Sequence, residues 1–408
     1  MLRLIIFTIL YVGLGAYVLQ GVKTITKNPW LVYIYVGLSL LVLCNLFYQF
    51  TIVDTGRALT RNKTYAFTFF VMLLVFNLVA VIFLFSEDII RFFIATYTKF
   101  YGETKSFAMP DRRKFLSKLA LGMAAIPFGA LLYGMYKGKY NFKVLKYDLE
   151  YDDLPDAFDG YQITQISDVH SGSFDDRKKI EYAIDLINKQ KSDVLLFTGD
   201  MVNNKAEEMY PWKDLFATLE AKDGKFSVLG NHDYGDYVNW PSKEAKEKNL
   251  KNLKDVQKEM GFDLLLNDSR YLVKGSDQIA LVGVENWGKG GFKKAGDLSK
   301  AASKIKREDF KILMSHDPSH WEQKVVDDPY HYHLTLSGHT HGMQFGIEIP
   351  GWFKWSPVKW RYKYWAGIYK EMGQFINVNR GFGFLGYPGR VGIWPEITVI
   401  TLKKKSLT

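Results

Sequence analysis

The chain has 408 residues, of which 48% are hydrophobic, and it carries a formal net charge of +10. The whole positive surplus lies in the first 140 residues, with 15 Lys and Arg against 5 Asp and Glu, while the other 268 residues hold 38 of each sign. A neutral C-terminal part lacks the basic surplus of a nucleic-acid-binding domain, so no nucleic-acid partner is expected. The single cysteine, Cys44, excludes an intrachain disulfide.

Three long apolar runs come first, over residues 4–22, 30–53 and 66–85. Each has about twenty residues and almost no charge, which is enough for a helix to cross the ~30 Å hydrocarbon layer of a membrane. They predict a membrane region over residues 1–110 with three transmembrane helices. Buried core helices are the alternative, but three such runs in series are rare in water-soluble domains.

Residues 111–140 are predicted to form a fourth apolar helix and a linker. The run 115–136 is weaker than the others because Gly, Ala, Met and Pro127 dilute it. The sequence DRRKFL at 111–116 resembles a twin-arginine export signal, in which paired Arg precede a mildly apolar segment. Such signals normally begin a protein, so basic residues that flank a membrane helix explain the pattern equally well.

The charges of the connecting segments do not decide the orientation, because either choice places eight Lys and Arg inside. Only the twin-arginine resemblance favours one side, since it requires Arg112 and Arg113 to be cytoplasmic. On that basis we expect a multi-pass protein of a bacterial inner membrane with its C-terminal domain on the extracytoplasmic side.

Residues 141–408 alternate between short apolar runs and helical patterns. Runs at 161–166, 194–197, 226–229, 310–314 and 334–336 are rich in Val, Ile, Leu and Phe and end at polar turns, which is typical of buried strands. Residues 178–189 and 243–259 have helical patterns. The alternation predicts an α/β domain.

A polar motif follows each apolar run. The motifs are Asp168-Val169-His170, Gly199-Asp200, Gly230-Asn231-His232-Asp233, Ser315-His316-Asp317 and Gly338-His339-Thr340-His341. Ligands of open α/β sheets lie beyond the carboxyl ends of the strands, so these motifs are expected to meet in one crevice. A lone Asp-x-His is more often a turn or a cap, and it is the ordered set that predicts a site.

The donor atoms of these motifs indicate a metal site. Asp, Asn and His without a thiolate suit Mn, Fe, Zn or Co better than a structural zinc bound by sulfur. Two pairs of ligands two residues apart, Asp168 with His170 and His339 with His341, can hold two ions. Asp200 could bridge ions ~3.5–4 Å apart, the separation at which two metals clamp a phosphate group.

Taken in order, the five motifs resemble the calcineurin-like metallophosphoesterase superfamily. The similarity runs from about residue 141 to residue 402 and includes Asn379-Arg380-Gly381 and Pro395-Glu396-Ile397. It implies that residues 141–408 form a four-layer sandwich, with two mixed sheets flanked by helices, which here follows an α-helical transmembrane region.

The resemblance also implies a role for each motif residue. The first ion would be held by Asp168, His170 and His341, the second by Asn231, His316 and His339, and Asp200 would bridge them. His232 would act on the leaving group or steady the phosphate, and Asp233 would orient its ring. Three further histidines, His320, His331 and His333, lie outside the motif positions and are expected to be partly buried or surface imidazoles.

These observations predict a membrane-anchored enzyme, a dinuclear-metal phosphohydrolase that cleaves a phosphate ester or pyrophosphate of a small-molecule or lipid-linked substrate. A phosphodiesterase or nucleotide hydrolase acting on soluble substrates shares the same motifs, and a non-catalytic membrane scaffold could keep the fold. A non-catalytic scaffold is disfavoured because this sequence keeps a suitable residue at every metal-ligand position of the superfamily motifs. A transporter is disfavoured because the three clear spans have no acidic or basic residue well inside them. No obligate protein partner is inferred.

The resemblance is closest to the bacterial membrane-associated branch of the superfamily, some of whose members cleave the pyrophosphate of a UDP-diacylglucosamine lipid precursor. Met343 departs from that branch, which more often has a second Gly at this position. The difference bears on the width of the pocket.

Residues 350–367 combine aromatic and basic side chains. Four of the ten Trp lie here, namely Trp352, Trp355, Trp360 and Trp365. Aromatic rings favour the lipid headgroup region and basic residues attract anionic lipid, so the segment is predicted to be a lip that takes an amphiphilic substrate from the membrane. Rings that pack on the domain's own core, or that stack on nucleic-acid bases, are the alternatives.

Overall fold

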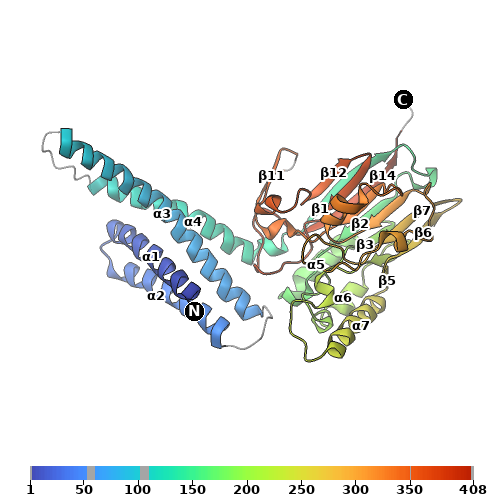
Figure 1. Ribbon diagram of the computed structural model, residues 1–408, viewed down its shortest axis with the longest axis horizontal. Coiled ribbons are helices and arrows are strands. Elements are labelled where there is room, and N and C mark those ends of the chain that lie inside the picture. Colours follow the sequence, from blue (N-terminus) through green and yellow to red (C-terminus); the bar gives the residue numbers. More distant parts are fainter. Residues whose placement is uncertain (1, 53–59, 102–109, 350, 406–408) are drawn as a thin grey trace. The chain divides into compact units, whose positions relative to one another are not determined.

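The computed structural model describes residues 2–52, 60–101, 110–349 and 351–405 (Figure 1). Val53, the end of the second predicted span, and Pro350, the start of the predicted lip, lie outside these ranges. The chain divides into two compact units that meet in sequence between Gly134 and Met135.

The N-terminal unit is helical. Its helices are α1 (Leu2–Ile25), α2 (Pro29–Phe47), α3 (Arg61–Tyr101) and α4 (Pro110–Tyr136). Within the described residues all four are long and apolar enough to cross a membrane. The fourth run forms one continuous helix despite Pro127. Helix α3 has 41 residues, about 60 Å at 1.5 Å per residue, and so extends well beyond the predicted span 66–85.

The C-terminal unit contains two six-stranded mixed sheets. The first has the order β1 (Lys143–Tyr151), β14 (Glu396–Lys404), β2 (Gln162–Ile166), β3 (Val194–Phe197), β4 (Lys225–Ser227), β5 (Phe262–Leu264). The second has the order β12 (Gly367–Glu371), β13 (Gln374–Val378), β9 (Leu334–Ser337), β8 (Lys311–Met314), β7 (Asp277–Gly283), β6 (Asp268–Lys274). Strands β2 to β5 run parallel, as do β7, β8, β9 and β13.

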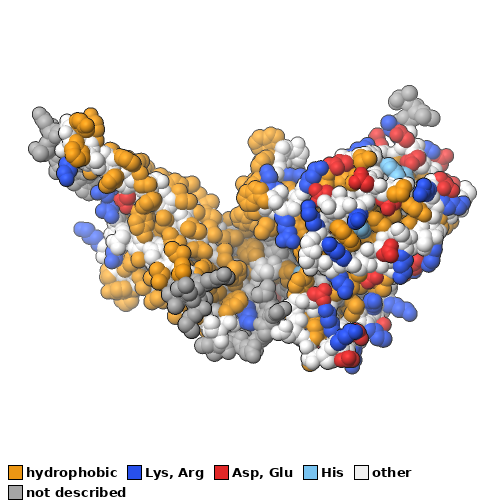
Figure 2. Space-filling view, in the orientation of Figure 1, with side chains coloured by type: hydrophobic (Ala, Val, Ile, Leu, Met, Phe, Trp, Pro, Cys, Tyr) orange, Lys and Arg blue, Asp and Glu red, His pale blue; other side chains and the backbone are white. Residues whose placement is uncertain are grey.

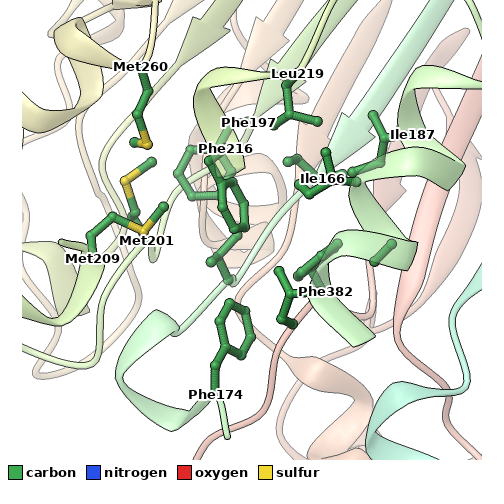
Figure 3. Close-up of a cluster of buried hydrophobic side chains, with 14 of the residues drawn as sticks. Ile166, Phe174, Ile187, Phe197, Met201, Met209, Phe216, Leu219, Met260 and Phe382 are labelled. Carbon is green, nitrogen blue, oxygen red and sulfur yellow. The ribbon is translucent and has the colours of Figure 1, made fainter. Parts of the chain in front are cut away.

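Strand β3 is apolar throughout because both of its faces are buried. Val194 and Leu196 face the second sheet, whereas Leu195 and Phe197 face the covering helices, because successive side chains of a strand point to opposite faces. The helices on the first sheet are α5 (Arg177–Asn188), α6 (Lys213–Ala217) and α7 (Lys243–Glu259). Figure 3 shows part of this cluster, in which Phe197 and Phe216 pack near Ile166.

The outer face of the second sheet is also covered. Val282 of β7 and Leu313 of β8 pack with Ala301 of the short helix α8 (Leu298–Ala301) and with Trp321, which follows α9 (Pro318–His320). The layers are therefore helices, sheet, sheet, helices. The predicted α/β sandwich of two mixed sheets, preceded by apolar helices, is confirmed.

A separate two-stranded hairpin belongs to neither of the six-stranded sheets. It pairs β10 (Ile347–Ile349) with β11 (Phe353–Trp355) in antiparallel register. It begins only a few residues after His341, and its second strand lies within the predicted lip.

Candidate metal centre and active site

The loops after β2, β3, β4, β8 and β9 meet at one end of the sandwich. They form two groups of donor atoms, Asp168 with His170 and His341, and Asp200 with His316 and His339, and the atoms of each group lie within 4.8 Å of one another. Asn231 joins the second group, since its Oδ1 lies 2.8 Å from His339 Nδ1. The structure thus brings together all seven residues that the sequence predicts as metal ligands.

The two groups are adjacent through Asp200. Its Oδ2 lies 3.1 Å from His316 Nε2 in the second group and 3.7 Å from His170 Nε2 in the first. In the first group His341 Nε2 lies 3.1 Å from both Asp168 Oδ1 and His170 Nε2. This geometry places Asp200 where a bridging ligand is predicted.

The donor set fits divalent cations. Two ring nitrogens, His170 Nε2 and His341 Nε2, face each other at 3.1 Å, an arrangement that needs a proton or a cation between them. His316 Nε2 is buried, and its contact with Asp200 Oδ2 at 3.1 Å lacks hydrogen-bond geometry; no other partner meets it within the described part of the chain. A buried nitrogen without a partner is costly unless it binds something else, and nitrogen and carboxylate oxygen are the donors that Mn, Fe, Zn and Co accept.

The electrostatics of the site also favour the binding of cations. Burial acts to lower the pKa of His316, but the Asp200 carboxylate outweighs it and raises that pKa to about 10. The site therefore attracts positive charge. Burial holds the pKa of His170 well below its ordinary value, which keeps this ring neutral and its lone pair available to a metal.

Five of the seven predicted ligands have a left-handed backbone. The φ angles are 53° at Asp168, 46° at His170, 59° at Asp200, 70° at His339 and 50° at His341. Such angles cost a non-glycine residue about 1–2 kcal/mol each and persist only where the surroundings impose them, which is typical of functional sites.

The glycines of the motifs let the carboxylates approach. A Cβ atom on Gly230 would collide with the Asp200 carboxylate, and one on Gly338 would collide with that of Asp168. Each glycine therefore belongs to its motif for a steric reason, because its loop packs directly against a ligand.

His232 lines the pocket as predicted, but Asp233 has a different contact from the one that the resemblance implies. His232 Nδ1 lies 2.7 Å from the backbone oxygen of Asn203, so a carbonyl orients the ring. The buried Asp233 carboxylate instead accepts hydrogen bonds from the backbone N–H groups of Asp200, Met201 and Gly230 at 2.8–2.9 Å. Asp233 thus fixes the turn that carries Asp200.

Several residues at the site were not predicted as functional. Tyr362 Oη lies 2.8 Å from His339 Nε2, and Asp317 Oδ2 lies 3.3 Å from the same nitrogen. Asn231 Nδ2 donates to Tyr237 Oη at 2.8 Å. Asp317 belongs to a motif and Tyr362 to the aromatic segment, so both had a signal in the sequence. Tyr237 and Asn203 had none.

A pocket of about 690 Å³ lies over the two groups of predicted metal ligands. Its floor includes ligands of both groups. Phe292, Tyr237 and Arg361 line it as well, together with a more apolar set of Met343, Pro357, Val358, Trp360 and Leu385. Met343 has a φ of 50°, which accounts for the glycine that the related branch favours at this position.

The three histidines outside the motifs lie outside this pocket. His320 is buried and its Nδ1 contacts Ser315 Oγ at 2.9 Å. His333 accepts from the backbone N–H of Lys311 at 2.9 Å and its Nε2 contacts Asp153. Both therefore act in the fold, as expected for imidazoles away from the metals.

Comparison with known families and proteins follows the same division of the chain. Residues 2–139 match the family described as "Probable Calcineurin-like phosphoesterase, transmembrane domain", and residues 161–343 match the family described as "Calcineurin-like phosphoesterase".

Individual relatives have low sequence identity to the chain but align with most of its length. The chain is 29% identical over 299 residues to the uncharacterized metallophosphoesterase YkuE of Bacillus subtilis, an alignment that covers 72% of this chain and 98% of the relative. An uncharacterized metallophosphoesterase of Aquifex aeolicus is 28% identical, with 68% and 99% covered. The "transmembrane protein with metallophosphoesterase domain" of Danio rerio is 25% identical, with 67% of this chain and 60% of the relative covered.

Proposed function

Because the chain carries a calcineurin-like phosphoesterase domain behind the transmembrane domain of that family, we propose that it is a membrane-anchored phosphohydrolase that uses two divalent metal ions. The observation that carries this proposal is the meeting of seven predicted ligands in two adjacent groups, five of which line one pocket. The bond cleaved is a phosphate ester or a pyrophosphate.

Different residues would bind the ions and act on the leaving group. Asp168, His170 and His341 would hold one ion and Asn231, His316 and His339 the other, with Asp200 shared. Bound there, the ions would polarise the phosphoryl oxygens and lower the pKa of an attacking water.

His232 is assigned to the leaving group. A carbonyl oxygen can only accept, so its contact with Asn203 places a proton on His232 Nδ1 and leaves Nε2 to act on the substrate. A protonated Nε2 would give its proton to the departing oxygen, as a positioned general acid does. Asp233 supports this step indirectly by holding the Asp200 turn.

The pocket lining favours an amphiphilic substrate. Arg361 offers a positive charge for a second phosphate or acidic group, whereas Val358, Trp360 and Leu385 offer apolar contacts. A phosphate-bearing lipid has both parts. A soluble nucleotide would use the charged side of the pocket but leave the apolar side in contact with water.

We also propose the domain limits 1–110, 111–140 and 141–408, a bacterial inner-membrane location and an extracytoplasmic catalytic domain. The last point rests on Arg112 and Arg113. Protease added to intact spheroplasts should cleave beyond residue 141. Cleavage that occurs only after lysis would place the domain in the cytoplasm.

Metal removal and replacement test the activity. Full-length protein in detergent is freed of metal with a chelator, checked by elemental analysis, and assayed on phosphomonoesters, diesters and lipid pyrophosphates after addition of Mn, Fe, Zn or Co. We expect activity to vanish and to return with at least one ion. Turnover of an aryl phosphate by verified metal-free protein would refute the mechanism.

A further inference from the structure

The two faces of the β10–β11 hairpin differ in chemistry. Ile347 pairs with Trp355 and Ile349 with Phe353, and these four side chains share one face because residues alternate along a strand. Glu348 and Lys354 occupy the other face. This inner face is fixed, since Arg380 donates to Glu348 and Lys354 Nζ donates to the backbone oxygen of Ala366.

The outer face is exposed to solvent. Ile347 is 56% exposed, Ile349 44%, Phe353 48% and Trp352, at the turn, 82%. Trp360 is 77% exposed, lies next to Trp355 with ring centroids 6.0 Å apart, and also lines the pocket. We call Ile347, Ile349, Trp352, Phe353 and Trp360 the hairpin patch. Figure 2 shows hydrophobic side chains gathered at this hairpin, and a contiguous apolar patch of this kind marks an interaction site.

Only part of the predicted lip is exposed. Tyr362, Tyr364 and Trp365 are buried against the domain, so for them the alternative of packing on the core is correct. Lys363 pairs with Glu371 at 2.7 Å. Lys359 and Arg361 are exposed and adjoin Trp360.

The path of the chain connects the hairpin patch to the membrane. Helix α4 ends at Tyr136, which is 81% exposed, and two residues later Gly138 packs so closely on Arg390 that a Cβ atom would collide with the Arg390 carbonyl. The next residue, Val391, donates to Gln344 and accepts from Gly346, at the base of β10. Two residues span at most about 7 Å, so the end of the apolar helix is tied closely to the base of the hairpin.

We propose that the hairpin patch inserts into the headgroup region of the membrane that the N-terminal helices span, and so holds the mouth of the pocket at the lipid surface. Tryptophan and phenylalanine with adjoining basic residues are the side chains that favour this region. The docking rests only on the patch and the tether, whereas its benefit to substrate capture rests on the proposed function.

Depth-dependent quenching tests the docking without an activity assay. In a Cys44→Ser background, Trp352→Cys is labelled with an environment-sensitive fluorophore, and the full-length protein is placed in nanodiscs with spin-labelled lipids. Met372→Cys, at an exposed turn between β12 and β13, is the matched control because Met372 is 71% exposed. We expect strong quenching at 352 by spin labels about 5–10 Å below the surface, and none at 372.

Two results would overturn the proposal. The first is equally weak quenching at both positions. The second is a label at 352 that is shielded from aqueous iodide but not quenched by spin-labelled lipid, which would mean that a second copy of the chain or another protein covers the patch.

An activity measurement then tests the consequence. In Trp352→Ala with Phe353→Ala, KM for a phosphate-bearing lipid in the same bilayer should rise at least about tenfold, because the loss of even one of two buried aromatic side chains has an effect of that size, while kcat/KM for a soluble aryl phosphate is unchanged. Equal losses on both substrates would contradict the role in capture. An inactive wild type with strong quenching at 352 would refute the proposed function and leave the docking intact.

Discussion

At the carboxyl ends of β2, β3, β8 and β9 the protein buries charged and polar side chains, whereas at the β10–β11 hairpin it exposes large apolar ones. Asp168, Asp200 and His316 are almost wholly buried, while Trp352 is mostly exposed. Each region departs from the ordinary partition of polar and apolar groups, but in the opposite direction.

The structure stabilises the two regions in different ways. At the metal centre the strained backbone and buried charges are held by neighbouring loops, for example by Asp233 and by the close approach of Gly230. At the hairpin only the inner face is held, through Glu348 and Arg380. We therefore propose that the first region is stabilised by an ion inside the domain and the second by a surface outside it.

The largest effect is expected from the ligand shared by both groups. Asp200→Asn should lower kcat for an aryl phosphate by about 10³–10⁴-fold, the rate equivalent of several kcal/mol of metal-dependent stabilisation. The measurement is steady-state turnover together with metal content by elemental analysis. Asp255→Asn, in an exposed pair on α7, is the control and should behave as wild type.

If Asp200→Asn keeps two ions and near-normal turnover, the burial of this carboxylate is structural and the comparison between the regions fails. A loss of both metal and activity, with the unfolding temperature of the metal-free protein unchanged, supports it.

How far the sequence predicts this molecule depends on how local each signal is. The seven predicted ligands stand out in the sequence because each motif is a short turn after an apolar run. The buried strands could be identified because their runs are short and largely apolar, and β3 and β8 have apolar side chains on both faces. The α/β class followed from the alternation of these strands with helical patterns, whereas the sandwich of two mixed sheets was implied by the resemblance to the superfamily.

The errors concern contacts between distant parts of the chain. Asp233 follows His232 directly, but the two side chains leave the turn in different directions, so its carboxylate reaches the Asp200 backbone instead of the ring. Tyr237 and Asn203 approach from loops without any motif. The composition of residues 350–367 could not show which rings are exposed, because that depends on the pairing of β10 with β11.

A smaller loss is expected from the group that faces the leaving oxygen. His232→Ala should reduce kcat by about 10²-fold on substrates with poor leaving groups, the lower end of the contribution of a general acid, and less on activated aryl phosphates. A series of esters with graded leaving-group pKa measures the dependence. Equal losses across the series would assign His232 to phosphate binding and not to proton transfer.

The inner face of the hairpin should contribute moderately to stability. Glu348→Gln leaves part of the buried Arg380 guanidinium without its charged partner, so the domain should lose about 2 kcal/mol, which corresponds to a fall of about 5 °C in unfolding temperature. Glu371→Gln breaks the exposed pair with Lys363 and should cost less than about 1 kcal/mol. Similar shifts in both variants would mean that the hairpin is not held through Glu348.

The smallest effect is expected from His333, a buried histidine that lies away from the predicted metal ligands. His333 is buried and has a partner on each ring nitrogen, unlike His316, and burial lowers its pKa to about 4 in spite of Asp153. Below the ordinary pKa of about 6.5 the unfolded chain gains a proton on this ring that the native protein does not take up. The stability is therefore complete above about pH 6.5 and falls as the pH drops toward 4.

Between pH 6.5 and 5.5 this loss grows by about 1 kcal/mol for one such group. His333→Gln should remove that part of the acid sensitivity, measured as the slope of unfolding temperature against pH, without changing metal content. His320, whose pKa burial also lowers to about 4, keeps its own contribution, so the slope should decrease but not vanish. An unchanged slope would show that His333 is already protonated in the native protein, and that burial with a partner on each nitrogen does not keep an imidazole neutral here.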